Sequence, residues 1–474
     1  MRESKLVLSI RSLDEKETAQ FHDFINSSFF NQREDVCQLL SNILDPENDL
    51  NKKNIHSQIY PDADYSDVRI RLLMSDTFRL LDKFLAYREF SANESVERLY
   101  SLRAYRKRRI KRSFEIKLSG AKKKLSSHQY KDSEFLWFQH MFESEKNLYL
   151  QDLKIRDKEP NLQSTMDSLD HVFIAKKVKY LCQMLNYEKV QNSKFNVELE
   201  DPVIKLIRES SLDEIPAIGI YFYLYNTMKH FDEDHYFHTT LDKIRKHWSL
   251  FSSDEAGQLF LICINYCIKK ILSGNKQYEQ LMLDIYKEMI NNDIILENGV
   301  MSPWLYKNVT SIGLRLNQTE WTLQFLNDYK EDIDPEFIDN AYIYNLAKVY
   351  FHKGEFVKVI ETLRSVEYND LFYALDVRAM LLKTYFELRE FVVMNSLASS
   401  FRQFVRRQTK LPEAHKKNYF NLISFTRKAA KAYYKDGRTI KRLIQQLQET
   451  ESISDKKWLV RKLEEMHASS RKAS

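Results

Sequence analysis

Apolar residues recur every three to four positions over most of this chain, and strand-like alternation is nearly absent. The first run follows Ser12 and Asp14, polar residues that are typical of a helix start. It places four apolar side chains on one helical face: Ala19, Phe21, Phe24 and Ile25. Comparable runs follow Asn31 and Pro61. From Asp201 onward we expect helices of about 12 to 20 residues, separated by short polar loops.

Glycine is scarce, at 8 of 474 residues, and proline is equally rare at 8. Sheets and hairpins use glycine at positive φ, so this composition favours an all-α fold. The apolar fraction of 43% supplies enough material for cores. We predict an N-terminal helical bundle (1–90), a basic helical connector (91–128), an α-solenoid of helix-turn-helix repeats (129–460) and a frayed charged tail (461–474).

Two segments of the C-terminal half share a pattern. Residues 343–356 and 378–391 both carry Tyr-Phe followed four positions later by Glu-Phe, with an offset of 35 residues from 343 to 378. Residues 430–437 repeat the first half of this unit, and residues 308–321 are a weaker relative. The best unit contains seven pattern residues: Leu346, Ala347, Tyr350, Gly354, Phe356, Val359 and Leu363.

These residues resemble the tetratricopeptide repeat, a helix pair of about 34 residues, although Leu382 replaces a small residue. The resemblance implies that the first helix of each pair lines a concave groove for an extended peptide. In that register, Lys348, Lys383 and Lys431 share one groove-facing position. Tyr344 and Arg427 lie one turn earlier in two of the units. A ladder of lysines suits an acidic peptide or a C-terminal carboxylate. Lysine is also common at any solvent-exposed position of a helix.

The N-terminal third carries a second resemblance. Its pattern is Leu13, Glu17, Phe21, Phe24, Ser27, Phe30 and Asn31, and a Tyr60-Pro61 pair and the run Arg69 to Ser75 come later. This is similar to a family of uncharacterised all-helical Bacteroidota proteins, most clearly over the first 90 residues. The resemblance implies kinship and a helical fold, without a specific activity.

A basic run extends from Arg103 to Lys124, with eleven lysines and arginines against one glutamate. Such a cluster could neutralise phosphates in a sequence-tolerant and salt-dependent way. The candidate contacts are Arg106, Arg108, Arg109 and Arg112. The competing interpretation is a solvated connector, or a face paired with acidic residues elsewhere in the fold. The overall net charge of +6 does not decide between them.

Catalytic signatures are missing from the sequence. The closest glycines, Gly299 and Gly313, lie 14 residues apart, which excludes a Walker A loop, a dinucleotide fingerprint and a kinase glycine loop. His230, Asp234 and His238 would share one helical face, but the acidic run 232–234 is more typical of a loop and helix start. We expect no catalytic residue, no cofactor and no metal.

Four scattered cysteines indicate a reducing compartment, and Cys263 and Cys267 suit a helical core. The N-terminus has too short an apolar run for a signal peptide. The apolar stretch from Leu259 to Leu272 is too short to span a bilayer. We therefore expect a cytoplasmic protein without a membrane partner.

The favoured function is a non-enzymatic helical scaffold that binds a protein or peptide, and the lysine ladder would suit an acidic one. The alternative is a nucleic-acid-associated factor that acts through residues 103–124. An enzyme without a recognisable motif is a third class, and it would require a cleft with convergent titratable groups. The sequence leaves the oligomeric state open.

Overall fold

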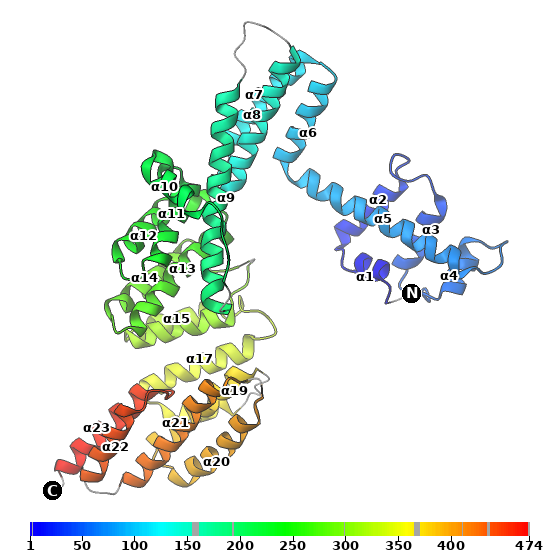
Figure 1. Ribbon diagram of the computed structural model, residues 1–474. Coiled ribbons are helices and arrows are strands. Elements are labelled where there is room, and N and C mark those ends of the chain that lie inside the picture. Colours follow the sequence, from blue (N-terminus) through cyan, green and yellow to red (C-terminus); the bar gives the residue numbers. More distant parts are fainter. Residues whose placement is uncertain are drawn as a thin grey trace. The chain divides into compact units, whose positions relative to one another are not determined.

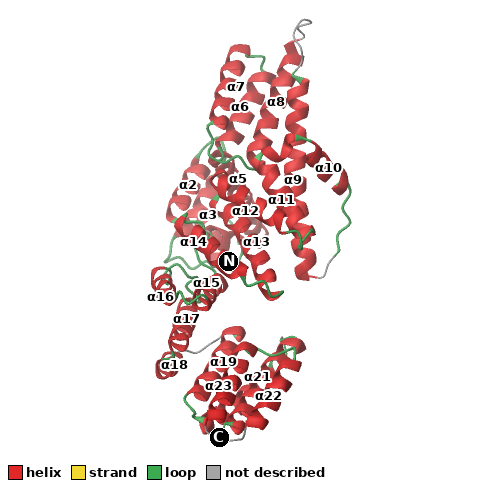
Figure 2. Ribbon diagram, turned by 90° about the vertical axis from the view of Figure 1, so that its left-hand side faces the viewer, coloured by secondary structure: helices red, strands yellow, loops and turns green. Residues whose placement is uncertain are grey.

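The computed structural model describes residues 1–474 except 2, 154–160, 192–193, 298, 365–369, 410, 434–436 and 473–474. This described part is 79% helical. It contains 23 α-helices, two short 3-10 helices and two isolated β-bridges, without a strand (Figure 2). The expected all-α fold is confirmed.

The chain divides into two compact units, Met1–Lys229 and His230–Ser474. In Figure 1 the first unit runs from blue to green and the second from green to red. The helices of the first unit are α1 Lys5–Arg11, α2 Glu15–Asn26, α3 Glu34–Leu44, α4 Lys52–Ile59, α5 Asp67–Ala92, α6 Glu94–Lys107, α7 Lys111–Ser126, α8 Ser133–Leu153, α9 Leu162–Gln191, α10 Glu200–Glu209, η1 Ser211–Glu214 and α11 Pro216–Lys229.

The second unit continues with helices in pairs. They are α12 Asp234–His247, η2 Trp248–Leu250, α13 Ser253–Leu272, α14 Gln277–Asn291, α15 Pro303–Arg315, α16 Thr319–Asp328, α17 Ile338–Lys353, α18 Phe356–Leu363, α19 Leu371–Glu387, α20 Phe391–Arg407, α21 Glu413–Ala432, α22 Gly437–Glu449 and α23 Lys456–Lys472.

Helices α1 to α5 form a bundle in which α5 contacts α1, α2, α3 and α4. Its core includes Phe21, Phe24 and Phe84, whose rings pack against one another. The start of α2 follows from a capping box: the Asp14 carboxylate accepts from the Glu17 amide, and the Glu17 carboxylate accepts from the Asp14 amide. Burial of this apolar face is the main force that holds the bundle together.

The basic segment 91–128 forms α6 and α7, which pack against α8 around Leu102, Phe114 and Phe142. Helices α7, α8 and α9 lie side by side (Figure 1). The expected boundaries after residues 90 and 128 lie near the ends of α5 and α7, while the division into compact units comes later, at residue 229.

Consecutive helices of the second unit contact each other as pairs, and α15, α17, α19 and α21 also contact one another in order. This is the arrangement expected of an α-solenoid. Gly354 ends α17 in the left-handed conformation (φ 77°), where glycine is unstrained. A Cβ atom at Gly313 would collide with the Thr322 side chain, so its absence lets α15 and α16 approach closely.

The third repeat unit begins in α21, but residues 434–436 lie outside the described part. The tail that was expected to fray from Arg461 lies within α23 as far as Lys472, with Leu459 and Leu463 buried in the core. Among the described helices, none has the length and apolar character needed to cross a bilayer.

Candidate functional site

A cavity of about 620 Å³ lies where α15, α17 and α19 meet the connection between α22 and α23. It is called the lysine cavity below. Its apolar wall includes Leu314, Phe351 and Met380. Its polar wall consists of Lys307, Asn317, Tyr344, Lys348, His352, Asp376, Lys383, Ser454, Asp455 and Arg461. Because successive first helices lie side by side, side chains at equivalent places in each helix converge on it.

Two of the three lysines are neutralised by aspartates. Lys307 forms an ion pair with Asp376. The Nζ atom of Lys383 lies 2.8 Å from Oδ2 of Asp455. The side chains of Lys307 and Lys383 are largely buried, at 21% and 13% exposure, and a buried ammonium group needs such a partner. These pairs are therefore part of the folded structure.

Lys348 is different, because its ammonium group donates a hydrogen bond to the Ser311 hydroxyl and has no carboxylate partner among the described residues. Burial and, to a smaller extent, the nearby charge of Lys307 together lower its pKa to about 7. The charges of Asp376 and Asp455 raise the pKa of Lys348, but they do not offset the lowering by burial and Lys307. An anion bound next to Lys348 would supply the negative charge that this lysine lacks.

The aromatic ring of Tyr344 contacts two of these lysines. The Nζ atoms of Lys307 and Lys348 are 5.6 Å and 5.8 Å from its centroid, within range of a cation–π contact. The ring also makes an edge-to-face contact with Tyr373, at 5.4 Å between centroids. Burial raises the pKa of Tyr344 well above its usual value, so its hydroxyl stays protonated and can donate a hydrogen bond.

The structure brings together three of the five predicted groove residues: Tyr344, Lys348 and Lys383. The other two lie outside the cavity. The Arg427 guanidinium donates to the Asn395 carbonyl and the Ser399 hydroxyl, and Lys431 is exposed on α21. The register identified from sequence is thus followed by α17 and α19, while α21 turns its corresponding side chains elsewhere.

Four functional candidates of the cavity were missed by sequence reasoning: Lys307, Asp376, Asp455 and Arg461. Lys307 immediately precedes the weak repeat at 308–321, so a more permissive repeat search could have included it. Asp376 lies two residues before the second strong unit. Asp455 and Arg461 come from the α22–α23 region, and no repeat signal marks their approach.

The basic segment is divided by the fold. Arg103 and Arg106 hold the buried Glu145 carboxylate at 2.6 Å and 2.9 Å, and Arg106 also lies 3.1 Å from Asp152. Of the four predicted polyanion contacts, Arg106 is therefore engaged inside the fold. The other three, Arg108, Arg109 and Arg112, are exposed at the turn between α6 and α7.

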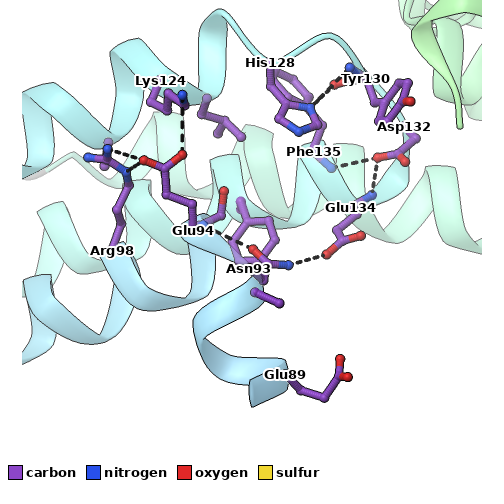
Figure 3. Close-up of a pocket in the computed structure, with 15 residues that line it drawn as sticks. Glu89, Asn93, Glu94, Arg98, Lys124, His128, Tyr130, Asp132, Glu134 and Phe135 are labelled. Carbon is purple, nitrogen blue, oxygen red and sulfur yellow. Dashed lines mark hydrogen bonds and ion pairs between the residues drawn. The ribbon is translucent and has the colours of Figure 1, made fainter. Parts of the chain in front are cut away.

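A second cavity, of about 430 Å³, lies among α5, α6, α7 and α8 (Figure 3). Several of its polar groups already contact one another. Glu94 binds Arg98 and Lys124, and the Asn93 amide donates to Glu134. Figure 3 shows these contacts, while Glu89 is drawn without one.

The His230 cluster serves the fold. Helix α12 begins at Asp234, and His230 lies in the preceding loop, as expected from the acidic run. The Asp234 carboxylate accepts from Tyr266 and Tyr278, at 2.9 Å and 2.7 Å, and pairs with Lys270 at 2.5 Å. Across the described part of the chain, no group of three or more His, Cys, Asp or Glu side chains is arranged to hold a metal ion.

The chain matches no protein-family model, no curated protein and no solved structure. The support for the candidate site therefore comes from its geometry.

Proposed function

We propose that the protein is a non-enzymatic helical scaffold that binds a partner protein through an acidic peptide segment, with a carboxylate of that segment in the lysine cavity. The observation that carries this proposal is Lys348, a cation without a carboxylate partner among the described residues, between two lysines that each have one. A carboxylate there would accept charge-assisted hydrogen bonds, which are stronger than neutral ones.

The composition of the cavity supports a peptide as the ligand. Its volume of about 620 Å³ is in the range of ligand pockets. Leu314 and Met380 offer an apolar wall for a side chain next to the carboxylate. Arg461 is 63% exposed at the side chain, and it could bind a second carboxylate at the cavity rim.

This proposal includes the finer assignments made from the sequence. We place the helix pairs of the second unit among tetratricopeptide-like repeats, supported by the contacts between successive first helices. The N-terminal bundle would share its origin with the Bacteroidota family that its sequence resembles. The cytoplasm is the proposed location, supported by four cysteines that are all free thiols.

A display library of random peptides with free C-termini tests the proposal. Peptides selected on the wild-type protein should be rich in aspartate and glutamate, and Lys348→Met should weaken their binding at least tenfold. The matched control is Lys431→Met, which removes an exposed lysine from the equivalent repeat position outside the cavity. Selection without an acidic preference, or equal loss in both variants, would contradict the proposal.

The exposed basic turn, Lys107–Arg112, favours nucleic-acid binding as the second candidate function. Five of its six residues are basic. None of these five forms an ion pair within the described part of the chain. Their positive charge is thus available to phosphates, unlike that of Arg106.

Filter binding of a labelled mixed-sequence DNA duplex at several salt concentrations tests this alternative. The double variant R108Q/R112Q should weaken binding and reduce the salt slope by about 2. The control R11Q/K16Q removes two exposed cations elsewhere in the first unit. Equal salt slopes for the two variants would contradict nucleic-acid binding through this turn.

A further inference from the structure

Helix α9 carries a stripe of exposed apolar side chains, called the α9 stripe below. Its members are Leu162, Met166, Leu169, Phe173, Tyr180 and Tyr187, each between 42% and 57% exposed. They follow one another at intervals of four, three, four, seven and seven residues. These residues occupy successive a and d positions of a heptad pattern, in which the polar residues Lys176 and Gln183 take two of the d positions.

Most of the fold's own contacts lie on the other side of α9, although the Lys176 ammonium group lies 4.9 Å from the ring centroid of Trp137 on α8. Val172, Ala175 and Cys182 are buried there. The first half of the helix contacts α8, where His140 and Ser168 form a hydrogen bond of 3.2 Å. The second half contacts α11, where the Cys182 thiol donates to the Tyr221 carbonyl. The α9 stripe is therefore additional to the core, and an exposed apolar surface of this kind marks an interaction site.

We infer that α9 pairs with α9 of a second copy of this chain as an antiparallel coiled coil. The placement of Lys176 within the stripe argues for this orientation. A parallel pair in register would put Lys176 against Lys176 of the other copy, which is unfavourable between like charges. In the antiparallel pair, a and d positions alternate across the seam. Lys176 then faces Phe173, Tyr180 faces Leu169, and Tyr187 faces Leu162.

The charges beside the stripe are self-complementary in the same register. Asp170 and Lys177 both occupy e positions, one heptad apart. Neither forms an ion pair in the described structure. In the antiparallel pair, Asp170 of each copy meets Lys177 of the other, so two ion pairs form per dimer. A parallel pair would bring neither residue to an opposite charge, and interfacial charges of this type set partner and orientation.

Sedimentation velocity of the full chain over a concentration series to about 100 μM tests this inference. The wild type should shift from monomer to dimer. D170K and K177D should each weaken association at least tenfold, because each variant places like charges opposite one another. An equimolar mixture of the two should recover a dimer of near wild-type strength, because its cross pairs are again opposite in charge.

The matched control is D167K, the same charge reversal on α9 but outside the α9 stripe, and it should dimerise like the wild type. A wild type that stays monomeric throughout the series would overturn the inference. So would a mixture of D170K and K177D that fails to recover the dimer, or variants that associate as strongly as the wild type. Circular dichroism of each variant shows whether its helices are retained.

Discussion

The ammonium group of Lys348 donates a hydrogen bond to the Ser311 hydroxyl, whereas each neighbouring lysine of the cavity faces an aspartate. A neutral hydroxyl satisfies one N–H group but not the positive charge. The folded protein therefore buries an amine whose charged form is costly, in a cavity that a ligand could enter. Retaining a destabilised charge is a common mark of a functional site.

Replacing Lys348 with methionine should stabilise the protein at neutral and acidic pH. Burial and Lys307 lower the pKa of Lys348 to about 7, so the folded state disfavours its charged form. The penalty is complete below pH 7 and disappears as pH rises toward 10.5. Because the Lys348 side chain is only half-buried, solvent screens part of the penalty, and we expect a gain of about 2 kcal/mol at pH 6. Chemical unfolding at pH 6 and pH 10 measures it.

The control for this prediction is Lys431→Met, which removes a lysine that is already exposed. Its free energy of unfolding should match that of the wild type at both pH values. A Lys348→Met variant that is less stable than the wild type at pH 6 would show that the lysine stabilises the fold.

Asp455→Asn should strengthen binding of the selected acidic peptides. The substitution releases Lys383 from its ion pair and removes a negative charge from the cavity. Asp455 has a positive φ of 52°, a conformation that asparagine also tolerates, so the loop should keep its shape. Its side chain is 37% exposed, and we therefore expect a modest gain of about threefold in affinity. Fluorescence anisotropy of a labelled peptide measures the change, and weaker binding would contradict the assignment of Asp455.

Asp234→Asn should destabilise the second unit. The Asp234 carboxylate is held by Lys270, Tyr266 and Tyr278, and these contacts lower its pKa to about 2 despite the opposing effect of burial. The Lys270 side chain is only 10% exposed, so it would lose its partner inside the fold. We expect a loss of about 2 kcal/mol and a lower melting temperature at pH 7.

The pH dependence gives this prediction its sharper test. The stability that ionised Asp234 contributes is present above its ordinary pKa of 3.8 and is lost as pH falls toward 2. The difference between Asp234→Asn and the wild type should therefore shrink between pH 4 and pH 2. Asp232→Asn, at an exposed position two residues earlier, should have little effect at any pH. A constant difference across this range would mean that the carboxylate charge is unimportant.

The helical architecture could be predicted because it depends on local patterns. Helical periodicity and the lack of glycine determine the fold class, and residues such as Gly354 mark helix ends that the structure contains. Ion pairs between distant segments could not be predicted in this way. Nothing in the sequence near Arg106 indicates that its guanidinium group forms ion pairs with Glu145 and Asp152.

The candidate site was predictable only where the repeat register holds. Lys348 and Lys383 have equivalent positions in two regular units, and both line the cavity. Arg427 follows the same register but binds the Asn395 carbonyl instead, because the packing of α21 differs. Asp455 enters from the α22–α23 connection, where the chain has no repeat to follow.

The central claim is that a carboxylate ligand of the lysine cavity pairs with Lys348. Calorimetric titration of a synthetic peptide with the selected sequence, in buffers of different ionisation enthalpy, tests it most directly. At pH 8 the wild type should take up close to one proton per peptide bound, because the ligand restores the charge on Lys348, and at pH 6 it should take up almost none. Lys348→Met should bind weakly and without proton uptake at either pH. Equal affinity and equal proton uptake in wild type and Lys348→Met would contradict the account.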